Sequence, residues 1–165
     1  MTNAMPPGSD RTDRIYQITL DEKSIARNNP NVDHEREVAI FDILDGNSFQ
    51  PEGRSDGPYR VHLAIVDDRL AIKVGNEAEE ELVVQHVPLT PFKRIIKDYF
   101  LICDTYYEAI RSAPPSRIQA IDMGRRGLHD EGSRLLKERL DGKLNIDFDT
   151  ARRLFTLLTA LHWKG

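Results

Sequence analysis

The chain of 165 residues contains a single cysteine, Cys103, so it cannot form a disulfide within itself. Proteins that do without disulfides are typical of reducing compartments. No apolar stretch approaches the roughly 20 residues that a membrane-spanning helix needs. The first residues also lack the apolar core of a signal peptide. We therefore expect a cytoplasmic protein with no membrane partner, whose stability comes from a hydrophobic core.

Sequence motifs for catalysis and cofactor binding are also missing. The chain has no Gly-x-Ser-x-Gly elbow, no cysteine and histidine spacing for zinc and no dinucleotide fingerprint. His34 and Glu35 begin as a zinc-protease motif would, but Val38 occupies the position of the second histidine. We therefore expect no metal site and no cofactor, and the sequence favours a non-enzymatic protein over an enzyme.

The net charge of −4 is unevenly distributed along the chain. Residues 1–90 carry 9 Lys and Arg against 17 Asp and Glu, a net charge of −8, whereas residues 91–165 carry 14 against 10, a net charge of +4. Such asymmetry indicates either a basic face for an anionic partner or an acidic sheet packed against a basic helical layer, and we favour the second. The overall acidity, with no aromatic and basic motif on a predicted strand, argues against nucleic acid as the partner.

The length of the chain suits one domain, which can bury about 70% of the surface that its unfolded form exposes. Residues 1–13 have no periodic apolar positions and contain Pro, Gly and Ser, so we predict a disordered tail followed by a single domain over residues 14–165. The predicted fold class is α+β, with a small antiparallel meander sheet of three to four strands packed against a layer of about four helices.

The predicted strands are short apolar segments, most of them with alternating polar residues. The meander covers Tyr59–Ile65, Leu70–Val74 and Leu82–Val87, and a strand over Ile15–Leu20 joins it at one edge. Residues 50–58 are rich in Pro and Gly and are predicted to form a loop.

The first predicted helix begins at Pro30 and runs to about Asp45, because Pro suits the first helical position and Gly46 and Asn47 follow as a stop. Its predicted buried side consists of Ile40, Phe41, Ile43 and Leu44. The last predicted helix is capped by Asp147 or Asp149 and runs through Trp163.

The main core helix is predicted to begin at Thr90-Pro91, with the Thr90 hydroxyl as its cap, and to end at Ser112. Apolar and aromatic residues recur along it at helical spacing as far as Ile110. Cys103 lies on this apolar face and is predicted to be an inert buried thiol. Ser116 and Gln119 form a predicted capping box for the next helix, which makes a hairpin with the first.

The stretch from Ala120 to Arg139 concentrates glycines and charges. In a helix, alternating charges would form a ladder of i,i+4 pairs at Asp122, Arg126, Asp130, Arg134 and Glu138, which contributes about 1 to 2 kcal/mol. The glycines at Gly124, Gly127 and Gly132 cost roughly 2 to 3 kcal/mol in total. We therefore expect either a second helix that crosses closely at the glycines, which we favour, or a kink.

The same stretch supports a functional hypothesis. Between Gly124 and Gly127, Arg125 and Arg126 can present two guanidiniums to a phosphate or carboxylate. His129 lies one turn further on and is a candidate acid or base. Either of two acids is a candidate to orient His129, namely Asp122 and Glu131. Because Arg125 and Arg126 point about 100° apart on a helix, we expect only one of them to share a face with His129.

Two hypotheses about function follow, and the first is the one we favour from the sequence. It is a non-enzymatic binding or regulatory module whose protein partner meets the basic helical side formed by Arg125, Arg126, Arg152 and Arg153. The second is an enzyme or sensor that binds a small phosphorylated ligand through Arg125 and Arg126. A flat surface at these arginines would favour the first hypothesis, and a concave pocket that contains both would favour the second. The sequence does not indicate an oligomeric state.

Five segments carry a specific pattern, namely His34–Phe49, Gly57–Leu70, Leu89–Arg111, Ile121–Leu136 and Asp147–Trp163. They resemble the bacterial Uncharacterised Protein Family 0262. The resemblance covers almost everything after the predicted tail and implies a single-domain bacterial cytoplasmic protein. It implies no activity, cofactor or catalytic residue.

Overall fold

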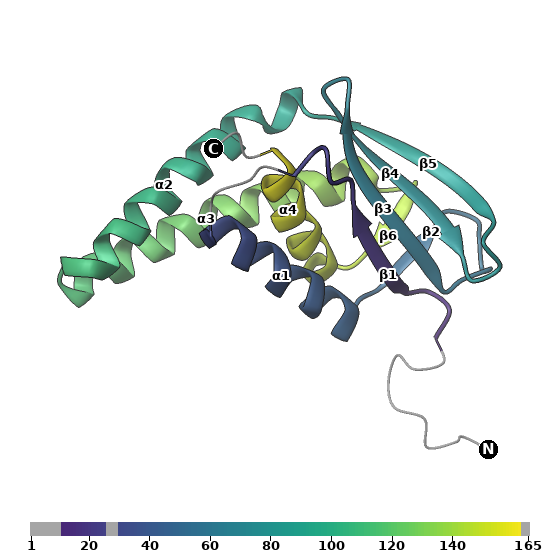
Figure 1. Cartoon of the computed structure of the whole chain (residues 1–165), viewed down its shortest axis with the longest axis horizontal. Coiled ribbons are helices and arrows are strands. Elements are labelled where there is room, and N and C mark those ends of the chain that lie inside the picture. Colours follow the sequence, from purple (N-terminus) through teal and green to yellow (C-terminus); the bar gives the residue numbers. More distant parts are fainter. Residues whose placement is uncertain (1–10, 26–29, 163–165) are drawn as a thin grey trace, which may run out of the picture.

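The computed structural model describes residues 11–25 and 30–162, which form an α+β fold as predicted (Figure 1). The larger sheet consists of β1 (Ile15–Leu20), β3 (Tyr59–Val66), β4 (Arg69–Asn76) and β5 (Glu81–Pro88). The helices are α1 (Pro30–Asp45), α2 (Lys93–Ser112), α3 (Pro115–Leu140) and α4 (Phe148–His162). Residues 1–10 of the predicted tail and Trp163, the predicted end of the last helix, lie outside the described residues.

The larger sheet has the spatial order β1-β3-β4-β5. Strands β3, β4 and β5 form the predicted antiparallel meander, in which Val61 pairs with Val74 and Val74 with Val83. Strand β1 joins at the predicted edge, but it runs parallel to β3, with Ile18 opposite Val61. The prediction of an all-antiparallel sheet is therefore wrong at this edge. The physical reason is that α1 lies between the two strands in sequence and provides the crossover that a parallel pair requires.

A second, two-stranded sheet was not predicted. Strand β2 (Phe49–Pro51) pairs antiparallel with β6 (Leu144–Ile146), and Phe49 lies opposite Ile146. The prediction of a loop over residues 50–58 is thus wrong at its start. A strand of three residues ending in proline has little local signal, and its partner comes from the far end of the chain.

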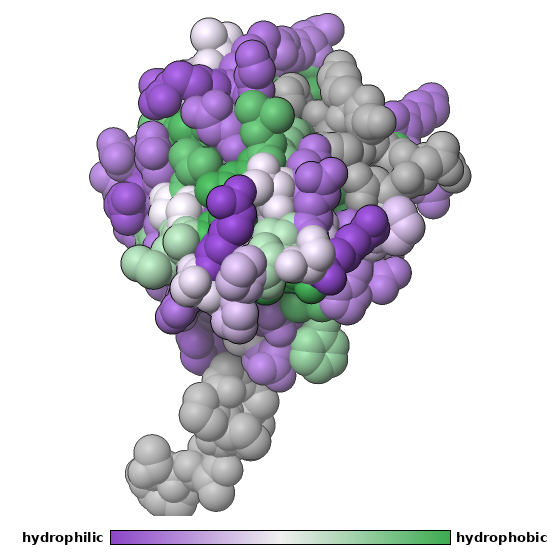
Figure 2. Space-filling view, turned by 90° about the vertical axis from the view of Figure 1, so that its left-hand side faces the viewer, coloured by the Kyte–Doolittle hydropathy of each residue, from purple (hydrophilic) through white to green (hydrophobic). Residues whose placement is uncertain are grey.

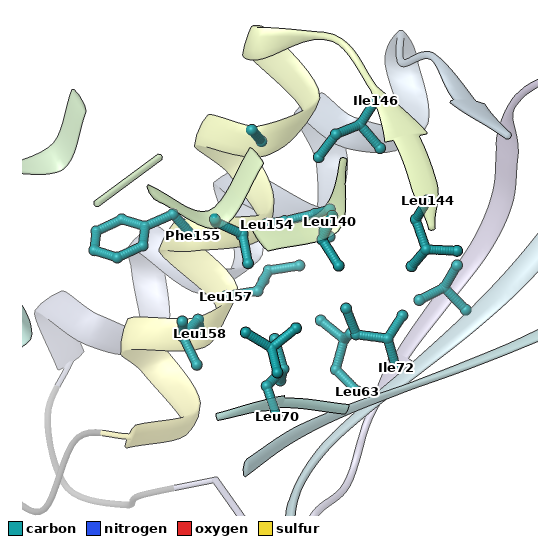
Figure 3. Close-up of a cluster of buried hydrophobic side chains, with 14 of the residues drawn as sticks. Leu63, Leu70, Ile72, Leu140, Leu144, Ile146, Leu154, Phe155, Leu157 and Leu158 are labelled. Atoms are coloured by element: carbon teal, nitrogen blue, oxygen red, sulfur yellow. The ribbon is translucent and has the colours of Figure 1, made fainter. Parts of the chain in front are cut away.

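The hydrophobic core lies between the larger sheet and α4, which is the central helix of the helical layer (Figures 1 and 3). Leu154, Phe155, Leu157 and Leu158 of α4 are all buried, and Figure 3 shows Leu154, Leu157 and Leu158 among side chains of the sheet, of α3 and of β6. Fully burying each side chain of this kind stabilises the fold by about 1.5 to 3 kcal/mol. Asp147 caps α4, since its Oδ1 accepts a hydrogen bond from the Thr150 N–H at 2.9 Å.

Helix α1 has the predicted bounds, but its buried side is narrower than predicted. Only Ala39 and Ile43 are buried, whereas Phe41 is 70% exposed and Leu44 is 42% exposed. The prediction that Phe41 and Leu44 belong to the core is wrong. Helix α1 packs mainly against α4 and lies on the outside of the helical layer, so only one narrow stripe of its surface is covered (Figure 1).

Helices α2 and α3 form the predicted hairpin, which extends well beyond the sheet (Figure 1). Neither predicted side-chain cap is present. Thr90 begins a short 3-10 turn (η1, Thr90–Phe92) without a cap hydrogen bond, and α3 begins at Pro115, ahead of Ser116. The prolines at 114 and 115 already impose the backbone angles of a helix start. Near the end of α2, which lies beyond the core, Ile110 is 49% exposed rather than buried.

The glycines of α3 serve close packing at two of the three positions. Helix α3 is continuous from Pro115 to Leu140, so the glycines do not interrupt it. A Cβ atom on Gly124 would lie 2.8 Å from Cδ1 of Ile102 on α2, and one on Gly132 would overlap the ring of Phe155 on α4. A Cβ on Gly127 would meet nothing within 4 Å. The predicted close helix crossing is therefore confirmed, with α2 at Gly124 and with α4 at Gly132.

Candidate functional site

A pocket of about 400 Å³ opens between α1, α3 and α4. Four arginines from two helices line it, namely Arg125, Arg126, Arg152 and Arg153. His129 and Thr156 lie among them, and Tyr99 of α2 also contributes to the lining. The opposite wall comes from α1 and includes two carboxylates, Glu35 and Asp42. Every residue of the predicted basic helical side thus lies at one concave site.

The placement of Arg125, Arg126 and His129 differs from our expectation. The spacing on a helix led us to expect only one arginine on the face of His129, whereas all three residues line the pocket. The expectation was wrong because positions three and four residues before a side chain are both its neighbours on a helix surface. Gly124 and Gly127 are absent from the lining; Gly124 instead packs against Ile102 of α2.

Asp122 holds both arginines of α3 in place. Its Oδ1 accepts hydrogen bonds from Arg125 Nη2 at 2.7 Å and from Arg125 Nε at 3.2 Å, and its Oδ2 lies 3.1 Å from Arg126 Nε. The Arg125 guanidinium also stacks 4.4 Å from the centre of the Tyr106 ring. Burial opposes the charge of Arg125, but the hydrogen bond to Asp122 leads the influences that raise its pKa on balance. Arg125 is therefore a fixed positive charge at the edge of the pocket.

The arginines of α4 are less engaged than those of α3. Arg152 Nε lies 3.5 Å from Asp130 Oδ1, and Arg152 Nη1 lies 3.8 Å from Asp149 Oδ1. Arg153 Nη1 donates a hydrogen bond to the Asp149 carbonyl oxygen at 3.1 Å. Among the described residues, the buried Nε atoms of Arg152 and Arg153 have no hydrogen-bond partner. The Arg152 guanidinium makes no hydrogen bond to another described residue, and that of Arg153 makes only the one to Asp149, so their terminal N–H groups keep donor capacity.

The charge ladder predicted along α3 forms at its first step only, within the described residues. Asp122 and Arg126 pair as expected, whereas Asp130 contacts Arg152 of α4. Glu131 lies 3.7 Å from Arg94 of α2. The acids of α3 thus connect it to both neighbouring helices and orient pocket arginines.

His129 is tied to α4 through its ring. Its Nε2 lies 2.7 Å from the Thr156 hydroxyl oxygen, and its Nδ1 lies 3.4 Å from the Ser133 hydroxyl oxygen. The Thr156 and Ser133 hydroxyls can donate to helix carbonyl oxygens of Arg152 and His129, respectively, at 3.2 and 2.7 Å. If Thr156 donates its proton in this way, its oxygen accepts from Nε2–H of the imidazole.

The surroundings of His129 favour its neutral form. Its ring packs edge-on against Tyr99 and Phe155, with centroid distances of 5.5 and 5.1 Å. Burial, together with the positive charge of Arg152, lowers the pKa of His129 to about 4. The predicted orienting acids, Asp122 and Glu131, are paired with arginines instead. The geometry therefore supports His129 as a link between α3 and α4, and no acid among the described residues is hydrogen-bonded to its ring.

The α1 wall contains residues that our sequence reasoning did not single out as a site. Glu35 accepts hydrogen bonds from the hydroxyl groups of Tyr99, at 3.2 Å, and of Tyr107. Burial raises the pKa of both tyrosines, so they remain protonated donors. Among the described residues, the half-buried Asp42 carboxylate has neither a hydrogen bond nor an ion pair. The spacing of Glu35, Ala39 and Asp42 on one helix face was the available signal.

Cys103 lies beside this wall and is buried, with 6% of its surface exposed. Burial raises the pKa of its thiol to about 12, and the Glu35 carboxylate adds to the shift. The expectation of a buried thiol is confirmed, and because the thiolate is the reactive form, its inertness stays a prediction.

The surface around the helical end of the molecule is mostly hydrophilic, with a smaller hydrophobic area among the polar side chains (Figure 2). Within residues 11–25 and 30–162, no helix is long and apolar enough to cross a membrane. The same residues contain no group of three or more His, Cys, Asp or Glu side chains that could hold a metal ion. The pocket between α1, α3 and α4 is therefore the candidate functional site.

Comparison with known proteins gives one family. The sequence model of the Uncharacterised protein family (UPF0262) matches residues 12–164. A UPF0262 protein of Bradyrhizobium sp. (strain BTAi1 / ATCC BAA-1182) is 56% identical over 161 residues, which are 97% of this chain and 96% of that protein. A UPF0262 protein of Rhodopseudomonas palustris (strain BisA53) is 55% identical over 165 residues, the full length of both chains. No solved structure matches.

Proposed function

The chain belongs to the Uncharacterised protein family UPF0262, and from its pocket we propose that it is a non-enzymatic binding protein for a small phosphorylated ligand. The observation that carries the proposal is the gathering of four arginines from α3 and α4 around one cavity of about 400 Å³. Cavities of this size are typical of small-molecule sites. We place this binding in the bacterial cytoplasm, where a lone thiol such as Cys103 stays reduced.

The chemistry of the arginines suits phosphate. A guanidinium offers planar, paired N–H donors that match phosphate and carboxylate oxygens, and hydrogen bonds between charged groups are stronger than neutral ones. The terminal amino groups of Arg152 and Arg153 have N–H donors that the described residues leave unused. Arg125 and Arg126 are held at the same pocket by Asp122, so little side-chain freedom would be lost on binding.

The concave shape favours a small ligand over the protein partner that we favoured from the sequence. A protein partner would bury a surface of about 800 Å² on each side, and hydrophobic anchors would be expected at its centre. The arginines instead surround a hollow between three helices. Binding is a better fit than catalysis, because the neutral ring of His129 is engaged with Thr156 and lacks an orienting acid.

Thermal unfolding with a panel of nucleotides and phosphorylated metabolites tests the proposal. A ligand at a hundred times its Kd should stabilise the wild type by about 2.7 kcal/mol. The variant Arg152→Gln/Arg153→Gln should lose this effect. The matched control is Arg134→Gln/Arg139→Gln, because these exposed arginines of α3 do not line the pocket. Stabilisation that is equal in all three proteins, or absent for every compound, would refute the proposed function.

A further inference from the structure

The charges of the pocket are divided between two walls. Arginines come from α3 and α4, and the carboxylates Glu35 and Asp42 come from α1. Among the described residues, no ion pair joins an acid of α1 to an arginine of α3 or α4, so all such charges across the pocket stand more than 4 Å apart. The opposite charges thus face each other across a gap, without contact.

The packing of α1 on α4 places Asp42 level with the arginines of α4. At one end of the pair, the Ser48 N–H, just after α1, donates to the Thr150 hydroxyl at 3.0 Å. At the other end, Glu35 lines a small hollow together with Thr159 of α4. The two helices therefore run antiparallel, and Asp42 falls opposite the first half of α4.

Asp42 is the carboxylate of this wall that the protein leaves free. Glu35 already accepts two tyrosine hydroxyl groups, from Tyr99 and Tyr107. The Asp42 carboxylate, half-buried in the lining, has no partner in the described part of the chain. A cationic donor bound in the pocket would form a charge-assisted hydrogen bond with this carboxylate, which is stronger than one between neutral groups.

We propose that the ligand is a compact phosphorylated amine, whose phosphate binds Arg152 and Arg153 while its ammonium group binds Asp42. This inference rests on the proposed function. The phosphate would accept hydrogen bonds from the terminal N–H groups that the two guanidiniums leave unused, and the ammonium group would pair with the free carboxylate across the gap. A ligand of this kind places a negative group against the arginine wall and a positive group against the carboxylate wall. A simple phosphate ester would leave the Asp42 carboxylate unpaired and would bring the negative phosphate close to it.

Isothermal titration with two probes tests the inference. O-phosphoethanolamine carries a phosphate and an ammonium group, and propyl phosphate has nearly the same shape without the ammonium group. Wild type should bind O-phosphoethanolamine about tenfold more tightly. In Asp42→Asn this preference should disappear, while propyl phosphate binds at least as tightly as before. Asp45→Asn, an exposed neighbour on α1 outside the lining, should behave as wild type.

The failures of the two proposals are distinguishable. Equal binding of the two probes to wild type, or a preference that survives in Asp42→Asn, overturns the phosphorylated amine and leaves phosphate binding intact. Binding of neither probe overturns both the inference and the proposed function.

Discussion

Gly132 of α3 lies directly against the ring of Phe155 on α4, so that an added Cβ atom would overlap three ring carbons. Phe155 is fully buried and cannot move aside easily. Gly127 lies on the same helix with open space at its Cβ position. A larger residue at Gly132 would therefore clash with the core, whereas one at Gly127 would not.

Alanine at each position should separate the two effects. Gly127→Ala should raise the free energy of unfolding by about 0.5 to 1 kcal/mol, because Ala is the better helix former. Gly132→Ala should lower it by about 1 to 3 kcal/mol, because overpacking outweighs that gain. Urea unfolding of both variants measures the difference. A stabilised Gly132→Ala protein would mean that α3 and α4 do not cross closely here.

His129 should make folding stability depend on pH. Burial lowers its pKa from the ordinary 6.5 to about 4, so the unfolded chain binds more protons than the folded protein between these values. The contribution is complete above about pH 6.5 and is lost as the pH falls toward 4. In His129→Gln, the decrease in the free energy of unfolding across this range should be smaller by about 3 kcal/mol. Urea unfolding at several pH values tests this, and parallel profiles for the two proteins would contradict it.

The Tyr107 hydroxyl should contribute to the attachment of α1 to α2. It donates a hydrogen bond to Glu35, and hydrogen bonds to charged groups contribute about 1.5 to 3 kcal/mol. Tyr107→Phe should therefore lower the free energy of unfolding by an amount near the lower end of that range, because the site is only partly buried. Tyr106→Phe is the matched control, since its ring can still stack on Arg125. Equal effects of the two substitutions in chemical unfolding would refute this role of Tyr107.

Cys103 should resist thiol reagents in the folded protein. With its pKa raised to about 12 from an ordinary 9.0, the thiolate fraction near pH 8 falls on the order of a thousandfold. Reaction with Ellman's reagent should therefore be far slower in buffer than in concentrated urea. Comparable rates in the two conditions would show that the thiol is accessible and ionised in the folded state.

Much of the fold could be predicted because its signals are local. The alternation in β3 and the helical spacing in α2 each reflect one buried face, and the bounds of α1 follow from Pro30 and Asn47. Asn47 ends α1 through its side chain, which donates to the Ile43 carbonyl oxygen at 2.6 Å and to the Ile15 carbonyl oxygen at 3.0 Å. The same side chain thereby fixes β1 beside the helix end, a contact that no local pattern indicates.

The errors arise where tertiary contacts decide the outcome. Strand β2 depends on β6 for its pairing, and the exposure of Phe41 depends on how little of α1 its neighbours cover. The parallel direction of β1 depends on the path of α1 between the strands. None of these relationships is encoded within a short window of sequence.

The candidate site was predicted only in part, because some of its residues come together only through tertiary contacts. Arg125, Arg126 and His129 were identified because they lie close together in sequence. The adjacent Arg152 and Arg153 were predicted to belong to the same basic helical side. The α1 wall was missed, since Glu35 and Asp42 reach the site only when α1 packs on α4. Three helices build the pocket, so its shape could not be derived from any one of them.

The most direct test of the central claim is an NMR titration of ¹⁵N-labelled protein with inorganic pyrophosphate, a probe that locates phosphate binding whatever the natural ligand is. We predict saturable shifts at the amides of Arg125, Arg126, Arg152 and Arg153 and at those of α1 around Asp42, with none at the distant meander turn at residues 77–80. These shifts should disappear in Arg152→Gln/Arg153→Gln. Shifts spread over all basic surface residues, or unchanged in that variant, would contradict a phosphate site between α1, α3 and α4.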